Sequence, residues 1–141
     1  MGYTTKFTGA VKLDRKLTMA EAKELLELAS SDNSEKVTGI RAYFQWVPAD
    51  TLEHIVWDGN EKFYEYAEQL QWLCGDWLDQ RGITANGEIY WQGEEAGDTG
   101  VIRVVANDVT TFPNSKPAGK SPRPLTLDDL GKMALDQVTA A

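Results

Sequence analysis

Residues 61–80 read EKFYEYAEQLQWLCGDWLDQ, and their pattern predicts a long helix over 61–81. At about 100° per residue, five carboxylates fall on one narrow side of that helix, and Trp72 lies in their midst. These acidic residues are Glu61, Glu65, Glu68, Asp76 and Asp79. The apolar residues that fall opposite this acidic stripe are Phe63, Tyr66, Ala67, Leu70, Leu73, Cys74, Trp77 and Leu78. The helix is therefore expected to bury one side, to expose a negative one, and to end at Gly82.

The segments around this helix alternate between strands and one more helix. Thr18 to Glu21 reads as a capping box that starts the other helix. Strands are predicted over 3–13, 40–47, 51–57, 88–92, 101–106 and 109–112, with turns at 58–60 and 86–87. Asp58 or Asn60 is the expected cap of the long helix. The resulting order favours an α+β fold, a ferredoxin-like β-α-β-β-α-β sandwich with an added C-terminal β-hairpin. Two helices would cover one face of an antiparallel sheet.

The composition changes at Pro113. Residues 1–112 are expected to form the α+β domain, and residues 113–125 a flexible linker rich in Pro, Lys, Gly and Ser. Residues 126–141 predict a short amphipathic helix capped by Thr126. Its apolar side would contain Leu127, Leu130, Met133, Ala134 and Val138. A helix of this length is marginal alone, so it is expected to dock on this domain, a second copy or a partner.

Charge is distributed unevenly along the 141 residues, whose formal net charge is −8. Residues 49–98 hold 12 acidic residues but only two basic ones, Lys62 and Arg81. Such a field repels phosphate backbones, so direct nucleic-acid binding is not expected. It favours a basic partner, a cation, or high solubility.

Several features indicate a soluble protein of the cytoplasm. No apolar run approaches the roughly 20 residues that a membrane span needs, and no signal-peptide pattern is present. The single cysteine, Cys74, cannot form an internal disulfide and fits a reducing compartment.

The segments WDGNEKFYEY (57–66) and NGEIYWQGEEAGDTGVIRV (86–104) are similar to a family of small bacteriophage-encoded proteins. The resemblance covers roughly residues 3–106 and leaves out the tail. It implies a phage context, hence the cytosol of a host cell, where many small phage proteins bind and inhibit host machinery such as defence systems. It implies no catalytic activity and no site residue.

Trp72 and the acidic stripe form the first candidate site. An exposed tryptophan ringed by carboxylates suits a basic protein surface, and tryptophan is prominent among binding hot spots. The alternatives are that Trp72 packs under the basic tail, or that it makes a homodimer contact.

A second candidate is the carboxylate-rich segment 88–98. A small-molecule ligand surface here would use Glu88, Tyr90, Gln92, Glu94 and Asp98, joined by Tyr43 from the strand 40–47. The segment EEAGDTG lacks the alternating Asp/Asn of a calcium loop. A weak hydrolase would need paired carboxylates in a cleft, whereas a solvated hairpin is the plain interpretation. Aromatics on this face also stack on bases in RNA-binding sheets, but Glu88 opposes that use.

No catalytic, cofactor or metal motif is present. His54 is the only histidine and Cys74 the only cysteine, and Cys74 is expected in the core. The sequence therefore predicts a non-enzymatic, cofactor-free protein that binds a basic partner, such as a phage inhibitor of a host defence or nucleic-acid-binding complex. A ligand-binding protein at 88–98 and a virion or assembly component are the alternatives.

Overall fold

The computed structural model describes residues 4–31, 34–41, 43–60, 63–113 and 122–140, with side chains described up to Met133. The elements in order are β1 (Lys6–Leu13), α1 (Met19–Ala29), α2 (Ser34–Thr38), β2 (Trp46–Pro48), β3 (His54–Trp57), α3 (Tyr66–Trp72), the π-helical segment η1 (Leu73–Leu78), β4 (Ala85–Gln92), β5 (Thr99–Val105), β6 (Asp108–Pro113) and α4 (Leu127–Ala140). The described part of the chain is thus a mixed α+β structure with four α-helices and six strands.

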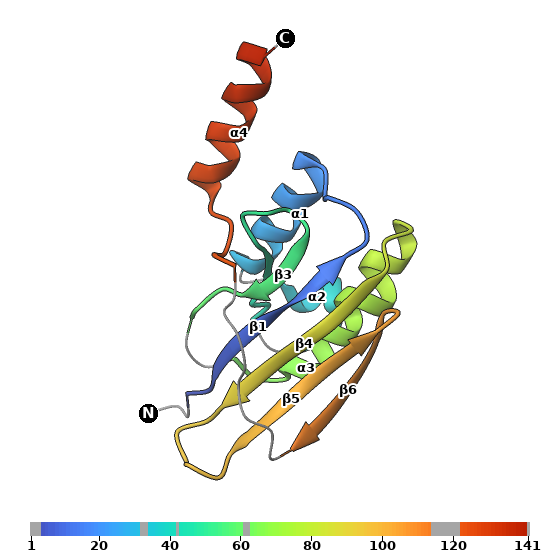
Figure 1. Ribbon diagram of the computed structural model, residues 1–141, viewed down its shortest axis with the longest axis vertical. Helices are drawn as coiled ribbons and strands as arrows, with labels where there is room; N and C mark the ends of the chain where they lie inside the picture. The colour runs from blue at the N-terminus through green and yellow to red at the C-terminus, as the bar shows by residue number, and fades with distance from the viewer. Residues whose placement is uncertain (1–3, 32–33, 42, 61–62, 114–121, 141) are drawn as a thin grey trace.

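All six strands form one antiparallel sheet in the order β2-β3-β1-β4-β5-β6. The helices α1, α2 and α3 lie together on one side of it, behind the sheet in Figure 1. The predicted hairpin after β4 exists, but β5 and β6 extend the same sheet rather than standing apart. Because of this extension, the order differs from that of a four-stranded sandwich.

The first strand and the first helix form as predicted. Phe7, Val11 and Leu13 share the buried face of β1. Thr18 Oγ1 accepts the Glu21 N–H, and the Glu21 carboxylate accepts the Thr18 N–H, which completes the capping box. Local signals determine both elements, because alternation and capping are read within a few residues.

The predicted strands 40–47 and 51–57 are both wrong in extent. β2 begins only at Trp46, and β3 only at His54. Leu52 has a φ of 62°, so the chain turns tightly just before β3. Residues 44–49 are all buried, so burial here does not follow the alternation on which the longer strand was predicted.

The long helix begins later than predicted. It starts at Tyr66 and continues through η1 to Gln80, where Gly82 with a φ of 70° ends it as expected. Glu65 precedes the helix, and Glu61 lies outside the described residues. Phe63 explains the late start, because it is buried in an aromatic cluster instead of lying on a helix. Its ring neighbours are Trp46, Phe7 and Tyr66.

The caps predicted for the helix and the turn predicted after it are also corrected. Asp58 accepts the Asn60 N–H in a local turn, so neither residue caps α3. Asn86 and Gly87 do not form a turn but lie within β4. A Cβ at Gly87 would lie 2.6 Å from the Ala10 carbonyl oxygen, so this glycine permits the close approach of β1.

The segment before α4 pairs with the domain. The Leu125 N–H donates to the Pro48 carbonyl, and the Leu125 side chain is buried. Thr126 caps α4 as predicted, since its hydroxyl accepts the Asp129 N–H. Leu130 is buried as well, so the first turn of α4 docks on this domain, while the rest of α4 projects from the body in Figure 1.

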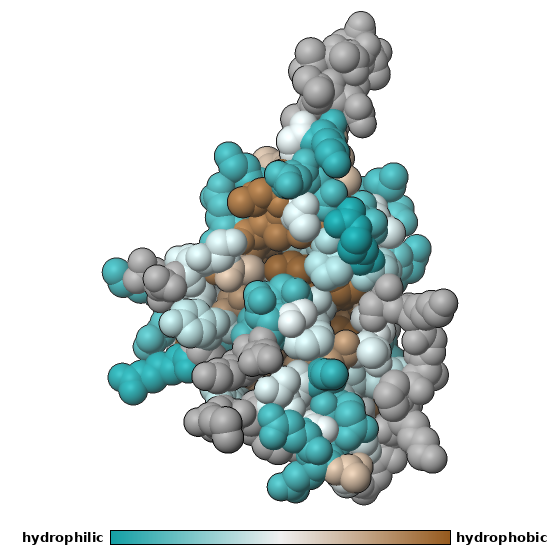
Figure 2. All heavy atoms as spheres, turned by 90° about the vertical axis from the view of Figure 1, so that its left-hand side faces the viewer, coloured by the Kyte–Doolittle hydropathy of each residue, from teal (hydrophilic) through white to brown (hydrophobic). Residues whose placement is uncertain are grey.

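Below α4, apolar side chains gather on the face drawn in Figure 2. A hollow of about 300 Å³ lies there, lined in part by Leu26, Val47, Leu125 and Leu127. The predicted linker is thus paired with the domain in its described part, and residues 114–121 lie outside the described ranges. Among the described residues, no helix is both long and apolar enough to cross a membrane.

Candidate functional site

The carboxylates of the acidic stripe lie at the surface and have no partner within the described chain. Glu65, Glu68, Asp76 and Asp79 are all exposed. None of the four side chains forms an ion pair or a hydrogen bond with another described residue. Their charge is therefore available to an external cation, although Glu65 precedes the helix on which it was predicted.

Trp72 is not the exposed anchor that the sequence predicts. Its side chain is only partly accessible and packs against the core. Its ring meets Phe44 edge-on, with 5.7 Å between the ring centroids. Such a contact holds the indole in one orientation, so Trp72 forms part of a wall rather than a projecting side chain.

The π-helical segment η1 explains this difference. In a regular α-helix, residues five apart lie far around the axis from one another, which placed Trp77 opposite Trp72 in the sequence pattern. In η1 the hydrogen bonds run from i to i+5, so each residue turns the chain by less than in an α-helix. Trp72 and Trp77 consequently line the same groove.

This groove, the Trp72–Trp77 groove, lies between α1, α2 and the α3–η1 helix and has a volume of about 240 Å³. Its lining includes Glu24, Glu27 and Leu28 from α1, Val37 from α2, and the two tryptophans. Val37 is 60% exposed and Trp77 only 5%, so the groove has an open apolar rim above an aromatic wall. The two carboxylates give this apolar surface a negative edge.

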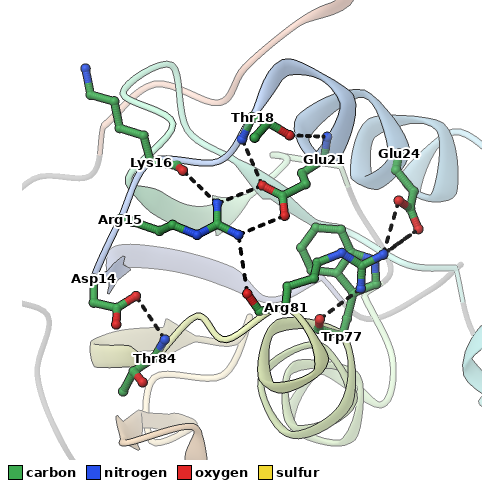
Figure 3. Close-up of polar contacts among 9 residues, drawn as sticks. All are labelled: Asp14, Arg15, Lys16, Thr18, Glu21, Glu24, Trp77, Arg81 and Thr84. Atoms are coloured by element: carbon green, nitrogen blue, oxygen red, sulfur yellow. Dashed lines mark hydrogen bonds and ion pairs between the residues drawn. The ribbon is translucent and has the colours of Figure 1, made fainter.

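A cation of the same chain covers the Trp77 ring (Figure 3). The Arg81 guanidinium carbon lies 3.9 Å from the centroid of the Trp77 ring. Arg81 also donates to both Glu24 carboxylate oxygens, at 3.1 and 3.2 Å, and to the Trp77 carbonyl at 2.9 Å. The Trp77 indole N–H donates to Glu24 at 3.2 Å. Tryptophan, carboxylate and guanidinium therefore satisfy one another here.

A second arginine holds the start of α1 beside the end of the long helix (Figure 3). Arg15 donates to both oxygens of Glu21, at 2.8 and 3.0 Å, and also to the Arg81 carbonyl at 3.4 Å. The hydrogen bonds from Arg15, with those of the Thr18 cap, lower the pKa of Glu21 to about 2. This pair fixes the relative position of the two helices that form the groove.

The carboxylates of segment 88–98 are used by their own chain. Glu88 pairs with Arg103 at 3.1 Å across the sheet, and Glu94 accepts the Thr4 N–H at 2.7 Å. Asp98 accepts the indole N–H of Trp91 at 3.0 Å. Glu88 and Asp98 therefore hold the β4–β5 hairpin together, and Glu94 connects it to the residue that precedes β1.

The remaining members of the predicted ligand surface do not come together. Gln92 donates to carbonyls of its own hairpin, and Tyr90 is partly buried on β4. Tyr43 lies elsewhere, beside the end of α1, where it lines a hollow with Asp58 and other residues. Residues 43–45 precede β2 rather than forming a strand, so the sheet face predicted to join Tyr43 to Tyr90 does not exist.

Cys74 and His54 are not arranged for metal binding or nucleophilic catalysis. Burial raises the pKa of the Cys74 thiol to about 12, so it is protonated at neutral pH. His54 lies within hydrogen-bonding distance of Thr51, at 2.8 Å, and burial lowers its pKa. Within the part of the chain that the structure describes, no group of three or more His, Cys, Asp or Glu side chains could hold a metal ion.

The groove residues on α1 and α2 were missed by sequence reasoning. Glu24 and Glu27 lie on an ordinary exposed helix face, and no pattern connects them with a helix some fifty residues later. Trp77 was correctly predicted to be buried, but its place in the groove depends on η1.

Comparison with protein-family models, curated proteins and solved structures found no match to this chain. The function must therefore be argued from the geometry of the molecule itself.

Proposed function

We propose that this protein is a non-enzymatic, acidic binding module for a basic protein surface. The observation that carries the proposal is the Trp72–Trp77 groove, an apolar hollow edged by carboxylates. Beside it, Glu68, Asp76 and Asp79 are exposed and unpaired among the described residues. Aromatic residues supply contact energy at interfaces, whereas complementary charge speeds the encounter and selects the partner.

The charge balance supports a basic partner rather than a nucleic acid. Unpaired carboxylates repel phosphate groups but attract lysine and arginine. The proposal extends to a host complex as the target, inhibited by a phage-encoded protein, which is the context that the sequence resemblance suggests. A host protein that binds nucleic acid would present the basic groove that this surface fits.

The arrangement of β1 to β4 supports the finer fold assignment that we propose, a ferredoxin-like core. β3 lies between β1 and β2 and is antiparallel to both, so β1 and β2 run parallel with one strand between them. A split βαβ unit has this arrangement. In this core, β5 and β6 are an extension beside β4.

The ligand-binding or hydrolase alternative at segment 88–98 receives less support. Two carboxylates that act as acid and base must be free to exchange protons with a substrate. Glu88 and Asp98 are instead bound to Arg103 and to the Trp91 indole. We therefore place the working surface on the helical side of the sheet.

The test is affinity capture from bacterial lysate with wild type and Trp72→Ala, followed by purification of the captured protein. Binding of the purified partner should weaken steeply as salt rises, because exposed charges contribute to the interface. Truncating Trp72 should cost about 2 kcal/mol, or roughly thirtyfold in dissociation constant.

Tyr64→Ala is the matched control, because Tyr64 is 51% exposed and lies outside the lining of the groove. It should bind the partner like wild type. Urea denaturation of each variant separates loss of binding from loss of folding. A partner that binds Trp72→Ala as tightly as wild type, or binds without salt dependence, would show that another surface does the work. Concentration-dependent light scattering tests the alternative of self-association.

A further inference from the structure

The groove contains one complete arginine-binding arrangement and the components of a second. In the complete one, Arg81 lies over the ring of Trp77 and bonds both oxygens of Glu24. The components of the second are Trp72 and Glu27, which lie like Trp77 and Glu24 on the continuous α3–η1 helix and on α1. Glu27 follows Glu24 by three residues on α1, so both carboxylates face the same side of that helix.

Within the described chain, no cation is bound by Trp72 and Glu27 as strongly as Arg81 is bound by Trp77 and Glu24. Glu27 pairs only with Lys23 of its own helix, at 3.7 Å, and both side chains are more than 60% exposed. Such a pair contributes little and exchanges readily for a better-placed cation. The Trp72 ring is fixed by Phe44 on one side and lines the groove on another.

The size and lining of the groove match one long cationic side chain. At about 240 Å³ it is smaller than the pockets of roughly 300–1,000 Å³ that hold drug-sized ligands. Leu28 and Val37 offer an apolar surface for the methylene part of such a side chain. A planar guanidinium stacks on an indole and bonds a carboxylate through two N–H groups, which an ammonium cannot do.

We propose that the Trp72–Trp77 groove binds an arginine side chain of the basic partner, with its guanidinium on Trp72 and bonded to Glu27. This inference rests on the proposed function and narrows it, because it names the anchor that the partner must supply. The partner would be recognised by an exposed arginine within a basic surface, and lysine at that position would bind less well.

The experiment uses the full chain labelled with ¹⁵N, in which the indole N–H signals report on each tryptophan. The probes are three acetylated, amidated tripeptides, Gly-Arg-Gly, Gly-Lys-Gly and Gly-citrulline-Gly, titrated to about 10 mM, where millimolar binding is measurable. The arginine peptide should bind roughly fivefold more tightly than the lysine peptide, and neutral citrulline should not bind. The signals of Trp72 and Trp77 should move, whereas that of Trp46, which is fully buried, should not.

Three variants locate the site. Glu27→Gln should weaken arginine binding roughly fivefold, because it removes the charged acceptor. Asp79→Asn tests the acidic stripe as the site instead, since it removes the same charge from an exposed position outside the groove lining. Arg81→Gln should free the position between Trp77 and Glu24, so that the Trp77 signal shows a further saturable shift with the arginine peptide.

The outcomes separate this inference from the proposed function. Equal binding of the arginine and lysine peptides would overturn the arginine site while leaving a basic partner in place. Arginine binding that is lost in Asp79→Asn but kept in Glu27→Gln would move the site out of the groove. A failure of all three peptides to bind would also overturn it, and the salt dependence of the captured partner would still decide the proposed function.

Discussion

The Trp72–Trp77 groove and the β4–β5 hairpin both combine tryptophan with carboxylates, yet they use them differently. In the hairpin, Asp98 bonds the indole of Trp91, whose ring is only 8% exposed. In the groove, Glu24 is similarly bound by Trp77 and Arg81, but Trp72 and Glu27 remain accessible. The same residue types thus build structure in one region and leave an open surface in the other.

This difference shows that a cluster of acidic and aromatic residues says little until its internal partners are known. In the sequence, the hairpin is equally rich in carboxylates, with Glu94, Glu95 and Asp98 around two glycines. Contacts within the folded chain occupy these carboxylates, and a carboxylate held by an N–H group is no longer available to a ligand.

The hairpin should be intolerant of added volume where Trp91 packs. A Cβ at Gly100 would overlap the Trp91 ring, so Gly100→Ala should lower the free energy of unfolding by about 3 kcal/mol. Gly97→Ala is the matched control, because among the described residues no atom beyond its two chain neighbours lies within 4 Å of the added Cβ, and it should change stability by less than about 0.5 kcal/mol. Urea denaturation followed by tryptophan fluorescence measures both. Equal stability of the two variants would mean that Trp91 does not close the hairpin.

The Trp77–Glu24–Arg81 cluster should contribute measurably to stability, whereas the acidic stripe should not. Glu24→Ala removes the acceptor of Arg81 and Trp77, and should cost about 1 kcal/mol, a modest value because the ion pair is partly exposed to solvent. Asp79→Ala in the acidic stripe should change stability by less than about 0.5 kcal/mol. Urea denaturation of the two variants at low and high salt makes the comparison. If Asp79→Ala lowers the free energy of unfolding as much as Glu24→Ala, the carboxylates of the acidic stripe are bound by the chain itself.

The Arg15–Glu21 pair should make the helical side of the molecule sensitive to acid. The pKa of Glu21 is lowered to about 2 in the folded state, below its ordinary value of 4.5. Its ionised form therefore stabilises the fold fully above pH 4.5, and that contribution is lost as the pH falls toward 2. Glu21→Gln should be less stable than wild type at pH 7, and the gap should close between pH 4.5 and 2.

The measurement is the midpoint of urea denaturation as a function of pH. Arg15→Gln should show the same weak dependence of stability on pH between 4.5 and 2 as Glu21→Gln, because hydrogen bonding from Arg15 is the largest cause of the lowered pKa. A gap that stays constant between pH 7 and 2 would contradict the assigned role of the pair.

Local patterns predicted part of this fold correctly. The alternation in β1, the capping box at Thr18 and the helix stop at Gly82 are each decided within a few residues. The cap of α4 by Thr126 belongs to the same class. In each case the hydrogen bond or the backbone angle involves residues that are close in sequence, so the pattern and its cause coincide.

Predictions that depended on distant contacts failed. Gly87 was interpreted as a turn residue, whereas the neighbouring strand β1 requires it at that place in β4. Phe63 was placed on the helix, but an aromatic cluster from three other segments holds it in the core. The predicted strand containing Tyr43 was wrong because buried residues follow one another there without alternation.

The candidate site shows the same division. The residue pattern alone indicates the mixed α+β composition, the concentration of negative charge in residues 49–98, and the presence of Trp72 among carboxylates. Which of these groups remain available depends on how the chain packs. The π-helical turn brings Trp77 beside Trp72, and α1 supplies Glu24 and Glu27 from far away in sequence. The physical reason is that helix register and side-chain pairing respond to packing between segments, which no local pattern encodes.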